Sequence, residues 1–494
     1  MGIIDGGIQV KIDQKFGVCF GIAFILLIMC AGLGTADTIY VNETAYACSG
    51  LDNISGVDQP ELFESTTSAS YFVGSKNSDV YHYPSCYYVD NILSANLIYF
   101  NTPESAINSG YRPCKYCNPP TTSSSSSETT IIQDAIDIAN NGDTIIISSG
   151  TYTENVNVYK ELTIISESGN PADTIIQAAD PNDHLFHVTA DNVTISGFTI
   201  IDAAGSSYYA NLYMGLLLEE VNYCNITNNK LSNNNVGIFL SSSSNNTLIN
   251  NNASNNDYGI WLWDSNKNNT LRDNIVNSND GSGIRLEDFS NNNKLINNTA
   301  NSNNHIGIYL YSSSNNAMTN NTASNNDNGI WLDYSSNSNT LINNIMCNNG
   351  QYGIQLIDAS SNNTIYNNFF SNTENSLVSI DSIGNVWNIT KAPGSNIVGG
   401  TYLGGNYWAM PDGAGFSQTR ADLNRDGICD SSHTINEYNI DYLPLSMSFD
   451  PMIYDFNDNG LIEKNEVMES IKDYFSNKIT KTDVMEVIIV YFSS

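Results

Sequence analysis

A glycine followed by an aliphatic residue recurs at a nearly constant spacing through the middle of the chain. Seven such glycines are separated by 22, 22, 24, 24, 22 and 24 residues. A period in this range indicates a solenoid, in which each repeat forms one coil that stacks on the next. The glycines are Gly215, Gly237, Gly259, Gly283, Gly307, Gly329 and Gly353.

Most of these glycines begin the pattern Gly-Ile-x-Leu, and its period-two alternation predicts a β-strand. The inward positions hold Ile238, Ile260, Ile284, Ile308, Ile330 and Ile354, joined by Leu240, Leu262, Leu286, Leu310, Leu332 and Leu356. A second short strand is marked by Ile226, Leu248, Leu271, Leu295, Met318, Leu341 and Ile365. Because no helical period separates these runs, we expect coils built from strands.

Asparagines also fall in columns. One column lies four residues before each glycine: Asn211, Asn233, Asn255, Asn279, Asn303, Asn325 and Asn349. Another lies three residues after each second-strand aliphatic: Asn229, Asn251, Asn274, Asn298, Asn321, Asn344 and Asn368. Stacked asparagines can bond amide to amide along a coil axis, and asparagine tolerates the left-handed backbone that corners need. We therefore predict a parallel β-helix with asparagine corners.

The segment before the repeats reads as a cap. Residues 131–166 predict a short helix followed by strands, and a solenoid needs such protection at its first coil. This segment, with "NVTISGFTII" (192–201), "GGNYW" (404–408) and "DLNRDGICD" (422–430), resembles right-handed β-helices of the NosD/CASH type with PbH1 repeats. The resemblance covers about 129–446 and implies a single-stranded parallel β-helix that binds or processes carbohydrate.

The charge limits the partners. The chain has 494 residues and a net charge of −33, so it repels nucleic acid and anionic membranes but can hold divalent cations. Lys11 and Lys15 precede an apolar run from Phe16 to Leu33, which predicts an export signal and an extracellular or cell-surface location. An uncleaved membrane anchor is the alternative for this run.

A cluster of cysteine and histidine before the repeats suggests a zinc site. His82 and Cys86 precede a Cys114-x-x-Cys117 pair, and Cys₃His suits a closed tetrahedral site. The segment resembles the zinc-binding domain of the Ada family, which has cysteine where His82 stands, so His82 is assigned by position. A disulfide among the three cysteines is the alternative in an oxidising compartment.

Two acidic stretches match the spacing of EF-hand calcium loops. The first offers five ligands around Gly427: Asp422, Asn424, Asp426, the Ile428 carbonyl and Asp430. Position 12 is His433, so a bidentate ligand must come from elsewhere, with Glu437 and Asp441 near in sequence; a solvated acidic turn is the alternative.

The second stretch is more complete. It fills its positions with Asp455, Asn457, Asn459, the Leu461 carbonyl, Glu463 and Glu466. Two helical patterns accompany it, and the tail resembles EF-hand and dockerin-like modules of secreted surface proteins. This module is a candidate for binding a protein partner.

These patterns divide the chain into segments. We expect a signal peptide (1–36), a linker (37–67), an Ada-like zinc-binding α+β domain (68–119), a Ser/Thr linker (120–129), an all-β parallel β-helix with a calcium-binding turn (130–446) and a helical EF-hand/dockerin-like module (450–494).

Aromatic residues mark the outward position of the Gly-Ile-x-Leu strands. Flat rings suit the apolar faces of sugars, so an exposed strip here predicts a carbohydrate-binding face; the alternative is an aromatic ladder that stabilises the coil wall. The predicted contact residues are Phe239, Trp261, Trp263, Tyr309 and Trp331.

Two functions fit a glycan-facing β-helix. The favoured one is a non-catalytic scaffold or adhesin that binds carbohydrate, with zinc and calcium as structural ions. The alternative is a polysaccharide lyase, epimerase or hydrolase, which needs acids and a base in one groove. The charged residues for such a site are Glu220, Asp264, Glu287, Asp288, Asp333 and Asp358, with Arg272 and Arg285; no catalytic residue is assigned.

Overall fold

The computed structural model forms two compact units, Met1–Trp261 and Leu262–Ser494, with the boundary inside one strand. The structure describes residues 38–42, 45–48, 63–64, 72–82, 89, 92, 96–100, 103–115, 130–205, 212–424, 426–446, 454–457, 459–476 and 481–493. The expected signal peptide and the Ser/Thr linker before residue 130 lie outside these ranges. Among the described residues, no helix has the length and apolarity to cross a membrane.

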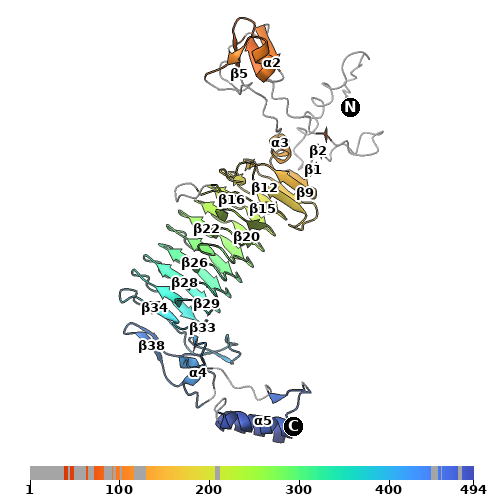
Figure 1. Ribbon diagram of the computed structural model, residues 1–494. Helices are drawn as coiled ribbons and strands as arrows, with labels where there is room; N and C mark the ends of the chain where they lie inside the picture. Colours follow the sequence, from red (N-terminus) through yellow and green to blue (C-terminus); the bar gives the residue numbers. More distant parts are fainter. Residues whose placement is uncertain are drawn as a thin grey trace, which may run out of the picture. The chain divides into compact units, whose positions relative to one another are not determined.

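Each full coil of the first unit contributes one strand to each of three parallel sheets (Figure 1). Sheet I contains β8 (Thr144–Ile147), β11 (Thr163–Ser166), β14 (Thr194–Ser196), β17 (Asn225–Thr227) and β20 (Thr247–Ile249). Sheet II contains β9 (Gly150–Thr153), β12 (Thr174–Gln177), β15 (Thr199–Ile201), β18 (Lys230–Ser232) and β21 (Asn252–Ala253). Sheet III contains β10 (Val156–Val158), β13 (Phe186–Val188), β16 (Met214–Glu219), β19 (Val236–Ser241) and β22 (Tyr258–Trp263).

The second unit has the same three sheets, but its first three coils contribute to sheet II only through isolated β-bridges, between Ile275, Thr299, Thr322 and Ile345. Sheet I here contains β23 (Thr270–Arg272), β25 (Lys294–Ile296), β27 (Ala317–Thr319), β29 (Thr340–Ile342) and β32 (Thr364–Tyr366). Sheet II contains β30 (Ile345–Cys347), β33 (Phe369–Ser371) and β37 (Tyr407–Ala409). Sheet III contains β24 (Ile284–Leu286), β26 (Ile306–Tyr311), β28 (Asn328–Asp333), β31 (Tyr352–Leu356) and β34 (Ser376–Val378).

The parallel β-helix is therefore confirmed, with one strand per coil more than the sequence predicted. The Gly-Ile-x-Leu strands form sheet III and the second predicted strands form sheet I. Sheet II was missed because each coil marks it with a single apolar residue, two positions after a corner asparagine. Those residues, all buried, include Leu231, Ala253, Ala300, Ala323, Met346 and Phe370.

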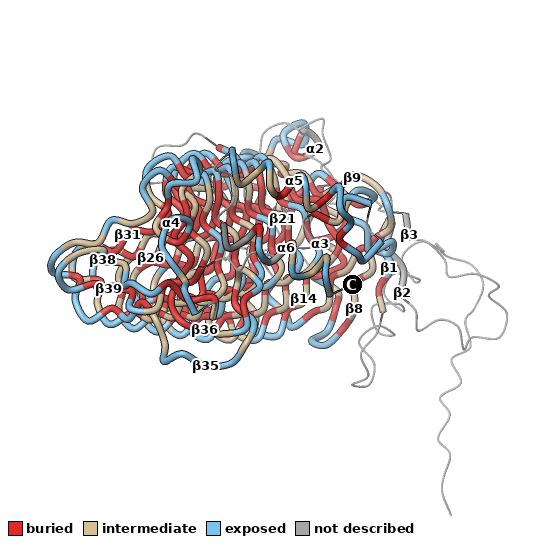
Figure 2. The backbone as a smooth tube through the Cα atoms, turned by 90° about the horizontal axis from the view of Figure 1, so that it is seen from below, coloured by how far each residue is buried: buried red, intermediate tan, exposed pale blue. Residues whose placement is uncertain are grey.

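The interior of the coils explains the apolar columns. Ile238, Leu240 and their equivalents in later coils are fully buried, and Figure 2 shows buried residues recurring from coil to coil with exposed residues at the turns. The glycine column has a steric cause, because a Cβ on Gly307 would lie 2.7 Å from the carbonyl oxygen of Gly329 in the next coil.

Buried asparagines form amide ladders inside the corners. In the second unit, Nδ2 of each residue donates to Oδ1 of the next over 2.9–3.0 Å. This ladder runs through Asn274, Asn298, Asn321, Asn344, Asn368 and Asn406. In the first unit, Asn229 donates to Asn251 over 3.3 Å. The second asparagine column therefore has the structural role that the sequence predicted.

The other predicted column is only partly correct. Asn279, Asn303 and Asn349 are buried ladder residues, and Asn211 lies outside the described residues. Asn233, Asn255 and Asn325 instead hold left-handed, exposed corner positions. Their neighbours Asn234, Asn256 and Asn326 occupy the ladder, because coils of different length displace the corner by one residue.

The first unit begins earlier than expected. Residues 37–67 were predicted to be a linker, but β1 (Thr38–Asn42) pairs in parallel with β8 and extends sheet I. β2 (Ala45–Cys48) and β3 (Phe63–Glu64) continue this edge in antiparallel fashion. The linker prediction is wrong for these strands because a short apolar strand has no periodic signal of its own.

A helix caps the first unit as predicted. α3 (Ile131–Ile138) buries Ile131, Ile132, Ala135 and Ile136. The buried carboxylate of Glu154 accepts hydrogen bonds from the N–H groups of Ile132 and Gln133, each at 3.0 Å. Burial raises the pKa of Glu154 to about 7.

The asparagine ladder of the second unit ends on a buried carboxylate, that of Asp441. Asp441 is fully buried and accepts hydrogen bonds from the backbone N–H of Asn406 (2.8 Å) and from Nε1 of Trp408 (2.9 Å). A Cβ on Gly405 would lie 1.8 Å from Asp441 Oδ1, and a Cβ on Gly404 would lie 2.9 Å from the Leu443 carbonyl oxygen, which explains the paired glycines of "GGNYW". Burial raises the pKa of Asp441 to about 7.

Smaller elements complete the second unit. β35 (Ala392–Pro393) pairs with β36 (Tyr402–Leu403), and β38 (His433–Asn436) pairs with β39 (Asn439–Asp441). The helices are α4 (Phe416–Thr419), α5 (Lys464–Phe475) and α6 (Lys481–Ser493).

Candidate functional site

The outward residues of sheet III in the second unit form a polar, aromatic column. Strand register places Arg285 beside Tyr309, Tyr309 beside Trp331 and Trp331 beside Gln355. The sequence predicted this outward column correctly. Because adjacent strands are about 4.8 Å apart, side chains from successive coils touch one another.

The charged groups of this column are paired. Arg285 forms an ion pair with Glu287, and its guanidinium lies 5.3 Å from the centre of the Tyr309 ring. The Tyr309 hydroxyl donates to Asp333 over 3.0 Å, and the Tyr309 ring meets Trp331 edge to face at 5.5 Å. Burial, together with the nearby Asp333 carboxylate, raises the pKa of Tyr309; burial also raises the pKa of Asp333.

Exposed aromatic rings lie at the end of β22 and just after the ends of β24 and β28. Trp263, Phe289 and Tyr334 are 42 %, 63 % and 56 % exposed. Trp263 Nε1 donates to Asp288 over 2.9 Å, and the rings of Tyr311 and Tyr334 stack at 5.0 Å with an angle of 16°. We call Trp263, Phe289, Tyr311 and Tyr334, with Asp288, the aromatic corner.

The equivalent column of the first unit is different. Phe239 is only 8 % exposed and packs with Met214, Leu217 and Val236, against which Trp261 also lies. The Phe239 and Trp261 rings meet at 5.4 Å in an edge-to-face arrangement. The prediction that Phe239 belongs to an exposed strip is wrong, because neighbouring side chains of the same column cover it.

Backbone conformation accounts for the acidic residues that stand five positions after four of the repeat glycines. Glu220, Asp264, Asp288 and Asp358 all have positive φ between 47° and 59°. Aspartate tolerates this left-handed conformation better than most residues, so turn geometry alone favours it here. Arg272 lies on β23 of sheet I and is 3.5 Å from Asp273. The structure therefore places Arg272 on a different sheet from Arg285.

The structure describes only part of the predicted zinc site. β4 (Phe72–Ser75), β5 (Val80–His82), β6 (Leu97–Phe100) and β7 (Arg112–Pro113) form a sheet beside α2 (Pro103–Asn108). β5 and β7 are parallel, and the Cys114 N–H donates to the Tyr81 carbonyl over 2.9 Å. This pairing brings buried His82, the last residue of β5, near buried Cys114, which directly follows β7. Cys86 and Cys117 lie outside the described residues.

In the first predicted calcium loop, the carboxylates accept hydrogen bonds from backbone N–H groups of the loop itself. Asp422 Oδ2 accepts the Gly427 N–H over 2.8 Å, Asp426 Oδ1 accepts the Ile428 N–H over 3.0 Å, and Asp430 Oδ2 accepts the Leu423 N–H over 2.9 Å. Lys391 forms an ion pair with Asp426. Asp441, a suggested extra ligand, is instead bonded to Asn406 and Trp408.

The second loop has similar hydrogen bonds from its backbone to its own carboxylates. Asp455 Oδ2 accepts the Gly460 N–H over 2.7 Å. Glu466 lies in the first turn of α5, fully buried, and accepts the N–H groups of Phe456 (2.9 Å) and Glu463 (2.8 Å). Among the residues that the structure describes, no group of three or more His, Cys, Asp or Glu side chains has the arrangement of a metal site. Calcium at both loops thus stays a prediction.

The stacked parallel sheets and the glycine and asparagine columns define the chain as a parallel β-helix protein with an Ada-like segment. Residues 127–288 and 210–413 match the family described as periplasmic copper-binding protein (NosD). Together these matches span more than half of the chain. The chain therefore belongs to this family. Residues 63–120 match the metal binding domain of Ada. The described residues do not fit a copper site, because they contain no cluster of metal-ligating side chains.

Other similarities are partial. A cell surface glycoprotein of Methanothermus fervidus is 37 % identical over 106 residues, which are 21 % of this chain and 16 % of that protein. The A-module of the mannuronan C-5 epimerase AlgE4 of Azotobacter vinelandii is 15 % identical, with a TM-score of 0.36 over 53 % of this chain and 87 % of that one. Pectate lyase Pel9A is 16 % identical, with a TM-score of 0.39 over 53 % and 75 %.

Proposed function

We propose that this protein is an extracytoplasmic β-helix that binds carbohydrate without transforming it, and that the aromatic corner of the second unit contacts the glycan. The location is supported by the printed names of the family and of the partial relative, one periplasmic and one of the cell surface. It also agrees with the export signal expected at the N-terminus.

The exposed rings of the aromatic corner carry the proposal. The rings of Trp263, Phe289, Tyr311 and Tyr334 come from four successive coils, and all but the half-buried Tyr311 are exposed. Aromatic side chains that remain exposed in a group usually mark a contact surface. A sugar ring can pack its apolar face on such rings. The Asp288 carboxylate beside Trp263 can then accept hydrogen bonds from sugar hydroxyls.

The pairing of the charged side chains favours binding over catalysis. Glu287 is engaged by Arg285, Asp288 by Trp263 and Asp333 by Tyr309. A tyrosine base would need a lowered pKa, whereas the pKa of Tyr309 is raised. The raised pKa of Asp333 is the observation that favours the alternative, a lyase, epimerase or hydrolase in which Asp333 acts as an acid.

The test compares two tyrosines of the same kind. Tyr334 and Tyr223 are 56 % and 64 % exposed, and both have positive φ, so replacement by Ala affects the backbone alike. A glycan array with the purified chain identifies a ligand, and a product assay on that ligand decides between binding and catalysis. We expect Tyr334→Ala to weaken glycan binding about tenfold and Tyr223→Ala to leave it unchanged. Equal effects of both variants, or a released product, would count against the proposal.

Zinc and calcium enter as structural ions. His82 ends β5 and Cys114 follows the paired strand β7, in agreement with a shared ligand set. Elemental analysis of the reduced full chain should find about one zinc, and calcium at the two loops should raise Tm. Absence of zinc would favour the disulfide alternative. A Tm that changes with neither calcium nor chelator would remove calcium from the proposal.

A further inference from the structure

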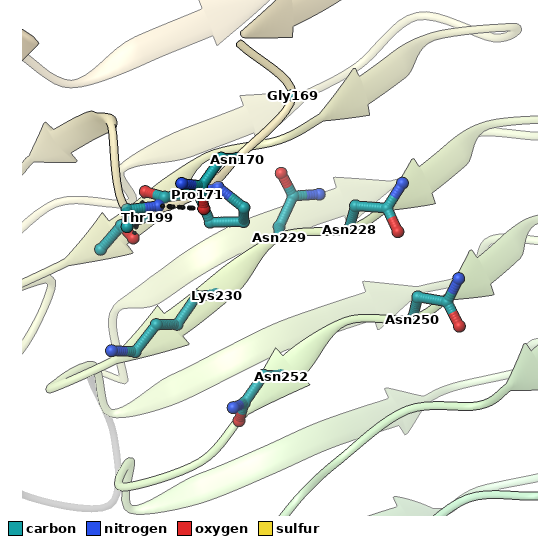
Figure 3. Close-up of a pocket in the computed structure, with 10 residues that line it drawn as sticks. Gly169, Asn170, Pro171, Thr199, Asn228, Asn229, Lys230, Asn250 and Asn252 are labelled. Carbon is teal, nitrogen blue, oxygen red and sulfur yellow. Dashed lines mark hydrogen bonds between the residues drawn. The ribbon is translucent and has the colours of Figure 1, made fainter. Parts of the chain in front are cut away.

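A hollow of about 600 Å³ lies on sheet II of the first unit, far in sequence from the aromatic corner (Figure 3). Small-molecule sites in proteins have volumes of this order. Its lining residues are Gly169, Asn170, Pro171, Ala172, Thr199, Asn228, Asn229, Lys230, Asn250 and Asn252. We call it the amide groove.

Two columns of side chains form its floor. Strand register places Thr199 beside Lys230 and Lys230 beside Asn252 on the outer face of sheet II. Asn228 and Asn250 lie at the corner before these strands, each with a φ of 55°. Figure 3 shows Asn228 above Asn250 and Lys230 above Asn252, so equivalent groups repeat from one coil to the next.

One end of the groove is closed by an enlarged turn. Seven residues separate β11 from β12, whereas two separate β14 from β15 and β17 from β18. The Thr199 hydroxyl donates to the Pro171 carbonyl over 2.6 Å, and Asn170 Oδ1 accepts the Ala172 N–H over 3.2 Å. These bonds hold the turn against sheet II, which makes the end wall of the groove a fixed surface.

The polar groups of the groove call for a ligand with both hydroxyls and a negative charge. Asn252 Oδ1 is buried, and no described residue donates a hydrogen bond to it. An unpaired acceptor is costly, so a rotation of the Asn252 side chain that brings Oδ1 to a sugar hydroxyl in the groove would be favoured. Lys230 is the one ionisable side chain of the lining, and among the described residues it forms no ion pair. An ammonium group in this position recognises a carboxylate or a sulfate.

The net charge of −33 does not prevent an anion from binding in this groove. At physiological ionic strength charges beyond about 8 Å are largely screened, so an anion in the groove is governed by Lys230 and the amides around it. We propose that the amide groove is a second carbohydrate site, which binds an acidic sugar residue with its carboxylate on Lys230 and its hydroxyls on Asn228, Asn250 and Asn252. This site is independent of the aromatic corner.

The experiment uses the full chain and short oligomers of galacturonic acid, studied by isothermal titration calorimetry. The methyl-esterified oligomer is the matched ligand, because it keeps the shape and loses the charge. Lys230→Gln removes the cation and Lys230→Arg keeps it. Lys294→Gln is the control, since Lys294 is also an exposed strand lysine but lies in the second unit. Because Lys230 and Lys294 are exposed, all three variants should fold.

We expect galacturonate oligomers to bind the native chain, and Lys230→Gln or esterification to weaken binding about tenfold, as the loss of one charged hydrogen bond does. Lys230→Arg and Lys294→Gln should bind within about threefold of the native chain. Equal binding of the esterified oligomer, equal binding by Lys230→Gln, or no saturable binding at all would overturn the site. A sulfated dextran oligomer, with plain dextran beside it, tests the anion: binding of the sulfate without the galacturonate would overturn the assignment to a carboxylate.

Discussion

The outward surface of sheet III differs in chemical character between the two units, although the inward residues of its strands are apolar in both. In the first unit the outward column is apolar, and Leu217, Phe239 and Trp261 pack on one another. In the second unit the same positions hold Arg285, Tyr309 and Trp331, and ionic and hydrogen-bonded pairs surround them. Both units share the buried inward columns and the asparagine ladders, so the outward residues can differ while the coil stays the same.

The largest expected effect concerns the part that both units share. Asn321→Ala removes the bonds that Asn321 makes to Asn298, Asn344 and the Leu295 carbonyl, and leaves their buried partners unsatisfied. We expect a loss of about 3 kcal/mol or more in the free energy of unfolding, measured by urea denaturation. Asn229→Ala in the first unit should cost a similar amount. If exposed Asn320→Gly costs as much, the ladder does not stabilise the coil.

A second prediction separates the two outward surfaces. Phe239→Ala removes a large buried ring, so we expect a loss of about 3 kcal/mol in the free energy of unfolding and no change in glycan binding. Tyr334→Ala should lower stability by about 1 kcal/mol or less, because the ring is largely exposed, and should weaken binding. Thermal melts and glycan titrations of both variants provide the measurement. The reverse pattern would make the first unit the binding surface.

A third prediction compares the buried carboxylates of the two units. The pKa values of Glu154 and Asp441 are raised to about 7, above the unfolded value of about 4. A raised folded pKa gives stability at low pH that is lost as pH rises through 7. Between pH 5 and 7 each group should therefore lower the free energy of unfolding by up to about 1.4 kcal/mol per pH unit.

Urea denaturation at several pH values checks this slope, and Asp441→Asn should make it shallower. A slope that stays the same in Asp441→Asn, or stability that rises from pH 5 to 7, would show that hydrogen bonds from Asn406 and Trp408 outweigh burial at Asp441.

The smallest expected effect is a difference in salt dependence between the two carbohydrate sites. Binding at the amide groove depends on Lys230, so raising NaCl from about 0.05 M to about 0.5 M should weaken galacturonate binding several-fold. Binding at the aromatic corner depends on ring stacking and should change by less than about twofold. Titration of each ligand at both salt concentrations provides the measurement. Equal salt dependence would remove the proposed contrast between the sites.

Much of the coil was predictable from the sequence. The spacing of Gly215 and its equivalents gives the repeat, and the alternation after each glycine gives the strands of sheet III. The Asn298 and Asn321 column gives a ladder, because only a buried, stacked position explains an asparagine at the same place in every coil. Sheet II and β1 were missed, since strands of two to five residues carry too little pattern to be distinguished from turns.

The candidate sites depended more on tertiary structure. The sequence identified Trp263 and Tyr309 as outward residues, but it did not show that Phe239 would be covered or that Tyr309 would bond to Asp333. It gave no indication of the amide groove. Its residues Asn170, Thr199, Lys230 and Asn252 follow one another at intervals of 29, 31 and 22 positions and meet only when coils stack.

By itself, the sequence determined the coil: its period, its inward residues and the asparagines of its corners, because each follows from a pattern within one or two repeats. Tertiary structure decided the surfaces. Whether an outward ring is buried or exposed, and whether Lys230 lies beside Asn252, depends on which side chains the neighbouring coils place next to it. Those contacts join residues more than twenty positions apart, and local physical chemistry does not encode them.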